Sequence, residues 1–234
     1  MTFRNRSEAG RQLARRLMHL ADAKPVVLAV GCGGFPVAVE IAEVLGAELD
    51  VLGAAELMPL EGSEPSLGAV AEGGACVIEP RAAARLGLGP EQFEHLLARR
   101  RAEAEEHGAS CRGGRPPTDL AGRIVIVAAD GVDGGIAPRA VLSAARSARP
   151  EWLVLATPIA DAKHLPALRA AVDELVVLDL PPEFIAVGYW YSQALRPSEG
   201  EIAAALGARG RPAPAGTFGP PPRASHSTLA VHGS

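Results

Sequence analysis

Short apolar segments that alternate with helical patterns constrain the fold of this 234-residue chain more than any other feature. Five such segments predict buried strands at residues 26–30, 51–54, 124–128, 153–159 and 175–178. Several of the intervening segments suit helices, at residues 35–45, 137–148 and 162–171. Continuously apolar strands separated by helices are typical of a parallel sheet that is covered on both faces. We therefore expect an α/β fold with helices flanking a parallel sheet.

Two further segments add detail to this fold. The stretch "SLGAVAEGGACVI" predicts a two-stranded β-ribbon that turns at Gly73 and Gly74. The stretch "GPEQFEHLLARRRAEAEEHG" predicts a charged helix with Pro90 near its start and Gly108 beyond its end. Its three arginines run into three glutamates, which favours a salt-bridged face exposed to solvent over a nucleic-acid patch.

The two ends of the chain differ in character. The segment "MTFRNRSEAGRQLARRLMHL" spaces arginine and leucine as a helix does, so it predicts a first helix with a solvated basic face and not a signal peptide or a membrane span. From Gly207 onward the chain is mostly Gly, Pro, Ala, Arg and Ser, which predicts a disordered tail. We therefore expect one domain over residues 1–206 and a tail over residues 207–234.

Composition narrows the classes of partner. Hydrophobic residues make up 48% of the chain but aromatic residues only 4%, which suits one core built mainly from Ala, Val and Leu. The formal net charge of -4 argues against nucleic acid and anionic membranes as partners, and favours a small molecule or a protein. The three cysteines are Cys32, Cys76 and Cys111; their odd number and the lack of CxxC spacing argue against disulfides or a zinc site. We expect reduced thiols in a cytoplasmic protein.

Two glycine-rich turns follow predicted strands. They read "GCGGFP" at residues 31–36 and "ADGVDGGIA" at residues 129–137. In an open parallel sheet, ligands collect at the carboxyl ends of the strands, where backbone N–H groups and a helix N-terminus face an anion. These turns are the candidate ligand site.

Five segments, in order along the chain, resemble the type I phosphoribosyltransferases, specifically the bacterial predicted phosphoribosyltransferase group. They read "FRNRSEAGRQLARRL", "GGFPVAVEIAEVLGAELDVL", "LGAVAEGG", "RGGRPPTDLAGRIVIV" and "PPEFIAVGYWY". The resemblance extends to about Leu206. It implies a core parallel sheet, a small hood made by the chain ends, and transfer of ribose 5-phosphate from phosphoribosyl pyrophosphate with Mg²⁺. It also implies a homodimer, in line with the prevalence of two-fold symmetry.

The ribose-phosphate loop departs from the family's pattern. The family has two adjacent acids for the ribose hydroxyls, whereas this chain has Ala129 and Asp130. The hydroxyl-bearing phosphate cradle of the family is replaced by small and apolar residues. Asp130 is the candidate catalytic residue, and the candidate phosphate-binding residues of this loop are Gly131, Asp133, Gly134, Gly135, Ile136 and Ala137.

The other family motifs also change at their polar positions. The pyrophosphate segment keeps Gly33 and Gly34, but Cys32 replaces an arginine. An Arg-Lys pair that the family shows after the second strand reads Ala55 and Glu56 here. In the hood the aromatic residues Tyr189 and Trp190 remain, while Ser192 and Gln193 stand where the family tends to place acids.

These changes predict a weakened phosphate site. A carboxylate such as Glu56 or Asp133 placed about 4 Å from a phosphate charge costs about 4 kcal/mol at an effective dielectric constant near 20, which weakens binding nearly a thousandfold. The first hypothesis is therefore a phosphoribosyltransferase-fold protein with weakened or lost transfer that acts as a ligand-binding or regulatory module. It has no metal, and its ligand is phosphoribosyl pyrophosphate or another small anion.

Two other functions stay open. An active Mg²⁺-dependent transferase would use Asp130 with loop arginines Arg112 and Arg115 and an unknown acceptor. A dinucleotide or methyl-donor site is a third class, although Pro36 occupies the third glycine position of its fingerprint.

Each candidate residue also has a structural interpretation. Asp133 can cap the following helix and Asp130 can hydrogen-bond the turn. Cys32 is either a thiol activated by the helix N-terminus or an inert turn residue. Tyr189, Trp190 and Tyr191 stack on a base or form a hydrophobic hood. The loop that carries Arg112 and Arg115 either swings over the pocket or is an ordinary solvated loop.

Overall fold

A six-stranded parallel sheet forms the centre of the protein, in a computed structural model that describes residues 2–58, 66–133, 136–193, 195–209 and 229–230. The strand order is β2-β1-β6-β7-β8-β9. The strands are β1 (Val26–Val30), β2 (Glu48–Leu52), β6 (Ile124–Ala128), β7 (Trp152–Ile159), β8 (Glu174–Asp179) and β9 (Leu229–Ala230). The expected parallel α/β sheet is confirmed.

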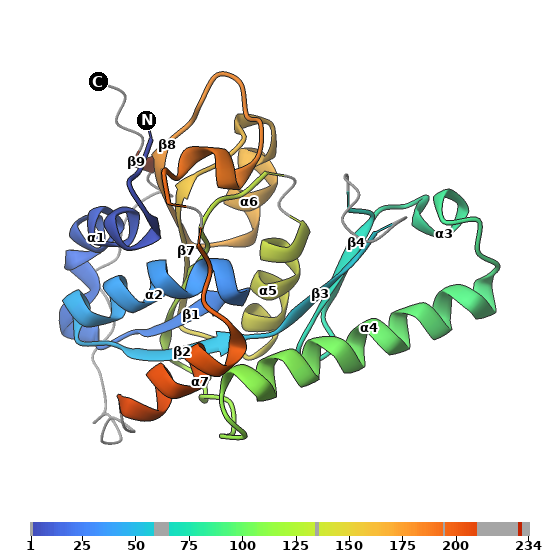
Figure 1. Ribbon diagram of the computed structural model, residues 1–234, viewed down its shortest axis with the longest axis horizontal. Coiled ribbons are helices and arrows are strands. Elements are labelled where there is room, and N and C mark those ends of the chain that lie inside the picture. Colours follow the sequence, from blue (N-terminus) through green and yellow to red (C-terminus); the bar gives the residue numbers. More distant parts are fainter. Residues whose placement is uncertain (1, 59–65, 134–135, 194, 210–228, 231–234) are drawn as a thin grey trace.

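Helices cover both faces of this sheet (Figure 1). Helices α1 (Arg6–Arg16) and α2 (Gly31–Leu45) pack with one another on one face, and α5 (Ile136–Ser147) and α6 (Leu165–Ala171) pack on the other. Successive residues of β1 and β6, and of β7 as far as Ala156, belong alternately to the two hydrophobic clusters, because side chains of a strand point to opposite faces. Both faces of β1 and β6 are apolar, which explains the unbroken apolar runs in the sequence.

Some predicted boundaries were wrong. The second strand was expected at residues 51–54, but β2 ends at Leu52 and Ala54 starts a separate strand, β3 (Ala54–Leu57). Gly53 marks the break, because a Cβ atom there would lie 2.0 Å from the carbonyl oxygen of Ala104. The segment "GCGGFP" is not an open turn either: α2 begins at Gly31, directly after β1.

Short 3-10 helices account for the other differences. The predicted helix at residues 162–171 is divided into a 3-10 helix, Ala162–His164, followed by α6. Another 3-10 helix, Met18–Ala23, follows α1, and a third, Val187–Trp190, lies in the predicted hood.

The predicted β-ribbon is part of a three-stranded antiparallel sheet. β4 (Gly68–Ala71) and β5 (Cys76–Ile78) turn at Gly73 and Gly74 as expected, and β3 adds the third strand in the order β3-β4-β5. The chain continues through α3 (Ala82–Arg85) into α4 (Pro90–Cys111). Figure 1 shows this small sheet and α4 extending to one side of the main sheet. The charged face of α4 carries the expected ion pairs, with Arg99 and Arg100 both bonded to Glu103.

A buried ion pair joins α4 to both sheets. Arg112 follows α4, and its side chain is 4% exposed, so the expectation of a solvated or swinging loop arginine was wrong. Its Nη1 donates to the carbonyl oxygen of Val51 at 2.9 Å and to Oε2 of Glu72 at 2.9 Å, and its Nη2 donates to the other carboxylate oxygen of Glu72. Glu72 also accepts from the backbone N–H of Gly53 at 3.3 Å. The pair therefore ties the end of α4 to β2 and to the ribbon.

The C-terminal part of the domain ends in α7 (Glu199–Ala208), which packs beside α4. Ser198 caps α7 and exchanges hydrogen bonds with Glu201. The helix passes the predicted domain boundary at residue 207, and β9 pairs with β8, so the predicted tail contributes two residues to the sheet. The rest of the tail, residues 210–228 and 231–234, lies outside the described residues. Among the described helices, none has the length and apolar character required to span a membrane.

Replacing Glu72 with Gln should destabilise the fold strongly. The change leaves the buried Arg112 guanidinium without its counter-charge, which we expect to lower the free energy of unfolding by about 3 kcal/mol. The matched control is Glu79→Gln, which breaks the surface pair with Arg85, where the side chains are 38% and 44% exposed. Exposed pairs contribute less than about 1 kcal/mol. The free energy of unfolding of both variants is measured by denaturant titration. Equal decreases in the two variants would contradict the assignment of Arg112 and Glu72 as a structural pair.

Candidate functional site

The two predicted ligand-binding segments meet at the carboxyl edge of the main sheet. Asp130 follows β6, and the first turn of α2 follows the adjacent parallel strand β1. A Cβ atom on Gly33 would lie 2.6 Å from Oδ2 of Asp130 and 2.9 Å from Oδ1. A Cβ atom on Gly34 would lie 2.5 Å from the carbonyl oxygen of Ala128. These glycines therefore serve close packing of α2 against the end of β6.

The carboxylate of Asp130 is bound by arginine. Nε of Arg6 donates to Oδ2 at 2.8 Å, and Nη2 of Arg196 lies 3.6 Å from the same oxygen. The side chains of Arg6 and Asp130 are 2% and 14% exposed, whereas Arg196 is 55% exposed. Asp130 is thus the acceptor of a largely buried ion pair with a second cation at its rim.

Sequence reasoning missed Arg6 because it placed the arginines of α1 on a solvated face. The helical spacing contained a usable signal: Arg6 precedes Ala9 and Leu13 by three and seven residues, and all three are buried. A residue in register with core positions lies on the buried face of a helix.

Tyr191 completes the surroundings of Asp130. Its hydroxyl donates to the carbonyl oxygen of Asp130, and its ring lies 4.6 Å from the guanidinium carbon of Arg6. Burial, and then the Asp130 carboxylate, raise the pKa of the Tyr191 hydroxyl above its ordinary value. Phe3 pairs with this segment through backbone hydrogen bonds to Trp190 and Ser192, each 2.9 Å long. The start of the chain and the segment around Tyr191 therefore form a small hood beside the sheet edge.

The aromatic residues predicted for the hood differ in exposure. Tyr189 is 66% exposed, whereas Trp190 is half-buried and packs against the hydrophobic core, with its ring centroid 5.9 Å from that of Tyr189. The same 3-10 helix places Val187 over Gly131, where a Cβ atom would lie 2.8 Å from Cγ1 of Val187. This contact leaves no space for a larger residue at position 131.

The other predicted ligand-binding residues of this loop lie between β6 and the start of α5. Asp133 is half-buried three residues before α5, Ile136 and Ala137 are the first two residues of that helix and are half-buried, and Gly134 and Gly135 lie outside the described residues. Glu56 was expected directly after the second strand of the main sheet. It lies instead on β3, four residues beyond β2, and is paired with Ala69 in the small sheet.

Cys32 lies in a cluster with residues of α4. Its Sγ is 3.7 Å from Nε2 of His107, and Cys111 is close to both. Burial, and then the carboxylate of Glu199, raise the pKa of the Cys32 thiol. This direction is opposite to the lowering that activation by a helix N-terminus would produce.

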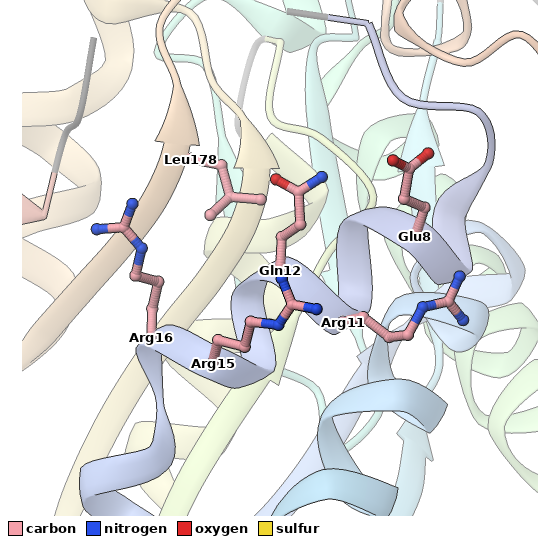
Figure 2. A pocket seen from close by; sticks show the side chains of 6 residues that line it. All are labelled: Glu8, Arg11, Gln12, Arg15, Arg16 and Leu178. Atoms are coloured by element: carbon pink, nitrogen blue, oxygen red, sulfur yellow. The ribbon is translucent and has the colours of Figure 1, made fainter. Parts of the chain in front are cut away.

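Two surface cavities lie away from these residues. One, of about 390 Å³, is lined by side chains of α1 and by Leu178 of β8 (Figure 2). Figure 2 shows three arginines of α1 along it; one of them, Arg11, is paired with Glu40 at 2.8 Å. The other, of about 410 Å³, lies against α4. Neither cavity is lined by Asp130, Gly33 or Gly34.

Comparison with known proteins identifies the family. No family model matches the chain. Two Mycobacterium tuberculosis proteins, named "Putative phosphoribosyl transferase Rv0571c" (strain H37Rv) and "Putative phosphoribosyl transferase MT0597" (strain CDC 1551), are each 34% identical over 205 residues. The match covers 87% of this chain and 46% of theirs, so the chain spans about half the length of these relatives. The crystal structure of TT1426 from Thermus thermophilus is 34% identical with a TM-score of 0.72, over 88% of this chain and 98% of TT1426. The chain therefore belongs to the same family as TT1426, and over 205 residues it is similar to proteins named putative phosphoribosyl transferases.

The resemblance to phosphoribosyltransferases implies Mg²⁺, and the contacts of Asp130 decide whether this carboxylate could bind the ion. This ion is bound through one or two carboxylates together with substrate phosphates. Oδ2 of Asp130 already accepts from Arg6, and Arg196 lies within 4 Å of it. Two guanidinium groups so close to the oxygen repel a dication, so Asp130 as it lies does not fit a Mg²⁺ ligand.

The raised pKa of Tyr191 predicts a loss of stability in alkaline solution. In the unfolded chain a tyrosine loses its proton near pH 10, whereas in the fold Tyr191 keeps it to higher pH. The unfolded state therefore binds fewer protons above pH 10, and the free energy of unfolding falls there by up to about 1.4 kcal/mol per pH unit from this group. Chemical denaturation between pH 9 and pH 11 should show a shallower decline for Tyr191→Phe than for the natural protein. Tyr189→Phe, at an exposed position, is the control, and a decline unchanged by Tyr191→Phe would contradict the assignment.

Proposed function

We propose that this chain is a phosphoribosyltransferase-family domain with weakened or lost phosphoribosyl transfer that acts as a ligand-binding or regulatory module. The observation that supports the proposal most is the ion pair between Arg6 and Asp130. It engages the carboxylate that the family resemblance assigns to the ribose hydroxyls.

The ion pair competes with a ribose for the carboxylate. Separating a buried carboxylate from its guanidinium costs roughly 3–5 kcal/mol. A hydrogen bond to a charged group contributes about 1.5–3 kcal/mol net, so two ribose hydroxyls that displaced Arg6 would only about balance the separation and would add little net affinity. Gly33 also lies against both carboxylate oxygens, which restricts approach from the side of α2.

The pyrophosphate segment supports the same conclusion. Sites for pyrophosphate place fixed donors and positive charge against the anion. Residues 31–36 contain no lysine or arginine, and they form the first turns of α2. Cys32, at the position of the family's arginine, faces His107 instead.

A small anion is the ligand that this arrangement favours. Arg196 is half-exposed at the rim of the Asp130 site and offers a cation to solvent. Guanidinium groups bind phosphate and carboxylate groups through paired N–H donors. We infer a module that binds such an anion, phosphoribosyl pyrophosphate included, with little or no turnover.

The alternative is an active Mg²⁺-dependent transferase. The observation in its favour is the 34% identity to relatives that are named as phosphoribosyl transferases. In that case the ligand itself would have to withdraw Arg6 from Asp130.

Pyrophosphate release separates these functions. The protein is incubated with phosphoribosyl pyrophosphate, Mg²⁺ and a panel of bases, and pyrophosphate is measured by a coupled assay. We expect release at the rate of the protein-free control, with no further change in Asp130→Asn. The transferase would be established if the natural protein released pyrophosphate, if Asp130→Asn abolished this release, and if Asp179→Asn, at the end of β8, left it unchanged.

A further inference from the structure

A cysteine-histidine cluster lies at the junction of three helices. Cys32 is in the first turn of α2, and His107 and Cys111 are one turn apart in the last part of α4. One ligand atom from each of the three residues lies within 4.8 Å of the other two. The cluster is partly buried: Cys111 is buried, Cys32 is half-buried and the side chain of His107 is 22% exposed.

The spacing of these atoms fits a tetrahedral metal ion. Zinc binds thiolate sulfur at about 2.3 Å and histidine nitrogen at about 2.0–2.1 Å, so a tetrahedral angle separates the two ligand atoms by roughly 3.6 Å. Sγ of Cys32 and Nε2 of His107 are 3.7 Å apart. Two ligands four residues apart on α4 lie on one face of the helix, as a shared metal requires.

We propose that Cys32, His107 and Cys111 bind a Zn²⁺ ion. Two sulfurs and one imidazole nitrogen form a ligand set that favours zinc over the harder Mg²⁺ and Ca²⁺. The three protein ligands leave a fourth tetrahedral position. Glu199, at the start of α7, lies beside the cluster, with Oε1 3.7 Å from Nε2 of His107.

The ion would join parts of the molecule that are distant in sequence. It would link the start of α2, which packs against Asp130 through Gly33, to the end of α4 beside α7. The inference does not depend on the proposed function, because the three ligands come from α2 and α4 and do not include Asp130. Sequence spacing alone gave no zinc motif, since 75 residues separate Cys32 from His107.

A cobalt titration tests the site in the protein of residues 1–234. Chelator-treated, fully reduced protein should bind one equivalent of Co²⁺, with sulfur-to-cobalt charge-transfer absorption and the intense visible bands of a tetrahedral ion. Added Zn²⁺ should displace the cobalt. Zinc should also protect two of the three thiols from a thiol reagent and leave the exposed Cys76 reactive.

Matched variants locate the ligands. Cys111→Ser and His107→Ala should each weaken binding by roughly 10-fold or more, whereas Cys76→Ser on β5 and His95→Ala on α4 should not change it. Reduced natural protein that takes up neither cobalt nor zinc would overturn the proposal, whether or not Cys32 and Cys111 form a disulfide on oxidation. An equal loss of metal affinity in Cys76→Ser and Cys111→Ser would also overturn the proposal.

Discussion

The ion pair between Arg6 and Asp130 organises the carboxyl edge of the main sheet. It joins α1 to the end of β6, and the ring of Tyr191 lies against the same guanidinium while its hydroxyl bonds the backbone of Asp130. The backbone N–H of Phe3 donates to the carbonyl oxygen of Trp190, the backbone N–H of Ser192 donates to the carbonyl oxygen of Phe3, and these two bonds hold the hood segment in place. A buried charge is tolerated only when it is paired and hydrogen-bonded, so these contacts depend on one another.

A second buried ion pair has the same role at the base of α4. Arg112 and Glu72 connect the end of that helix to β2 and to the ribbon, and Gly53 permits the close approach of α4. Both pairs use polar residues to fix the relative positions of secondary-structure elements. In both cases the charges act within the protein, between elements of the fold.

The regular core could be predicted from the sequence, because buried parallel strands are apolar throughout. The first and third predicted strands, at residues 26–30 and 124–128, match β1 and β6 residue for residue. Boundaries failed at Gly53, where glycine permits close packing against α4, and at Gly31, whose positive φ of 56° lets α2 begin directly after β1. The meeting of Gly33 with Asp130 followed from the rule that parallel strands end at one edge of a sheet.

The partners of the polar residues could not be predicted in the same way. Arg6 and Asp130 are 124 residues apart, and Arg112 and Glu72 are 40 apart, so no local pattern links them. The position of Glu56 was predicted wrongly because the chain leaves the main sheet at Gly53. The basic residues near Asp130 are Arg6 of α1 and Arg196 of the segment before α7, both distant from Asp130 in the sequence. The spacing of apolar residues along the sequence predicts which positions are buried. Which charged residues pair with one another depends on tertiary contacts.

A double-mutant cycle between Arg6 and Asp130 tests the central claim most directly. The free energy of unfolding is measured for the natural protein, Arg6→Met, Asp130→Asn and the double variant. We expect each single change to cost about 3 kcal/mol and the double variant to lose about 2 kcal/mol less than their sum. Losses that add to within about 0.5 kcal/mol would show that the two side chains act independently, and would contradict the claim that Asp130 is held by Arg6.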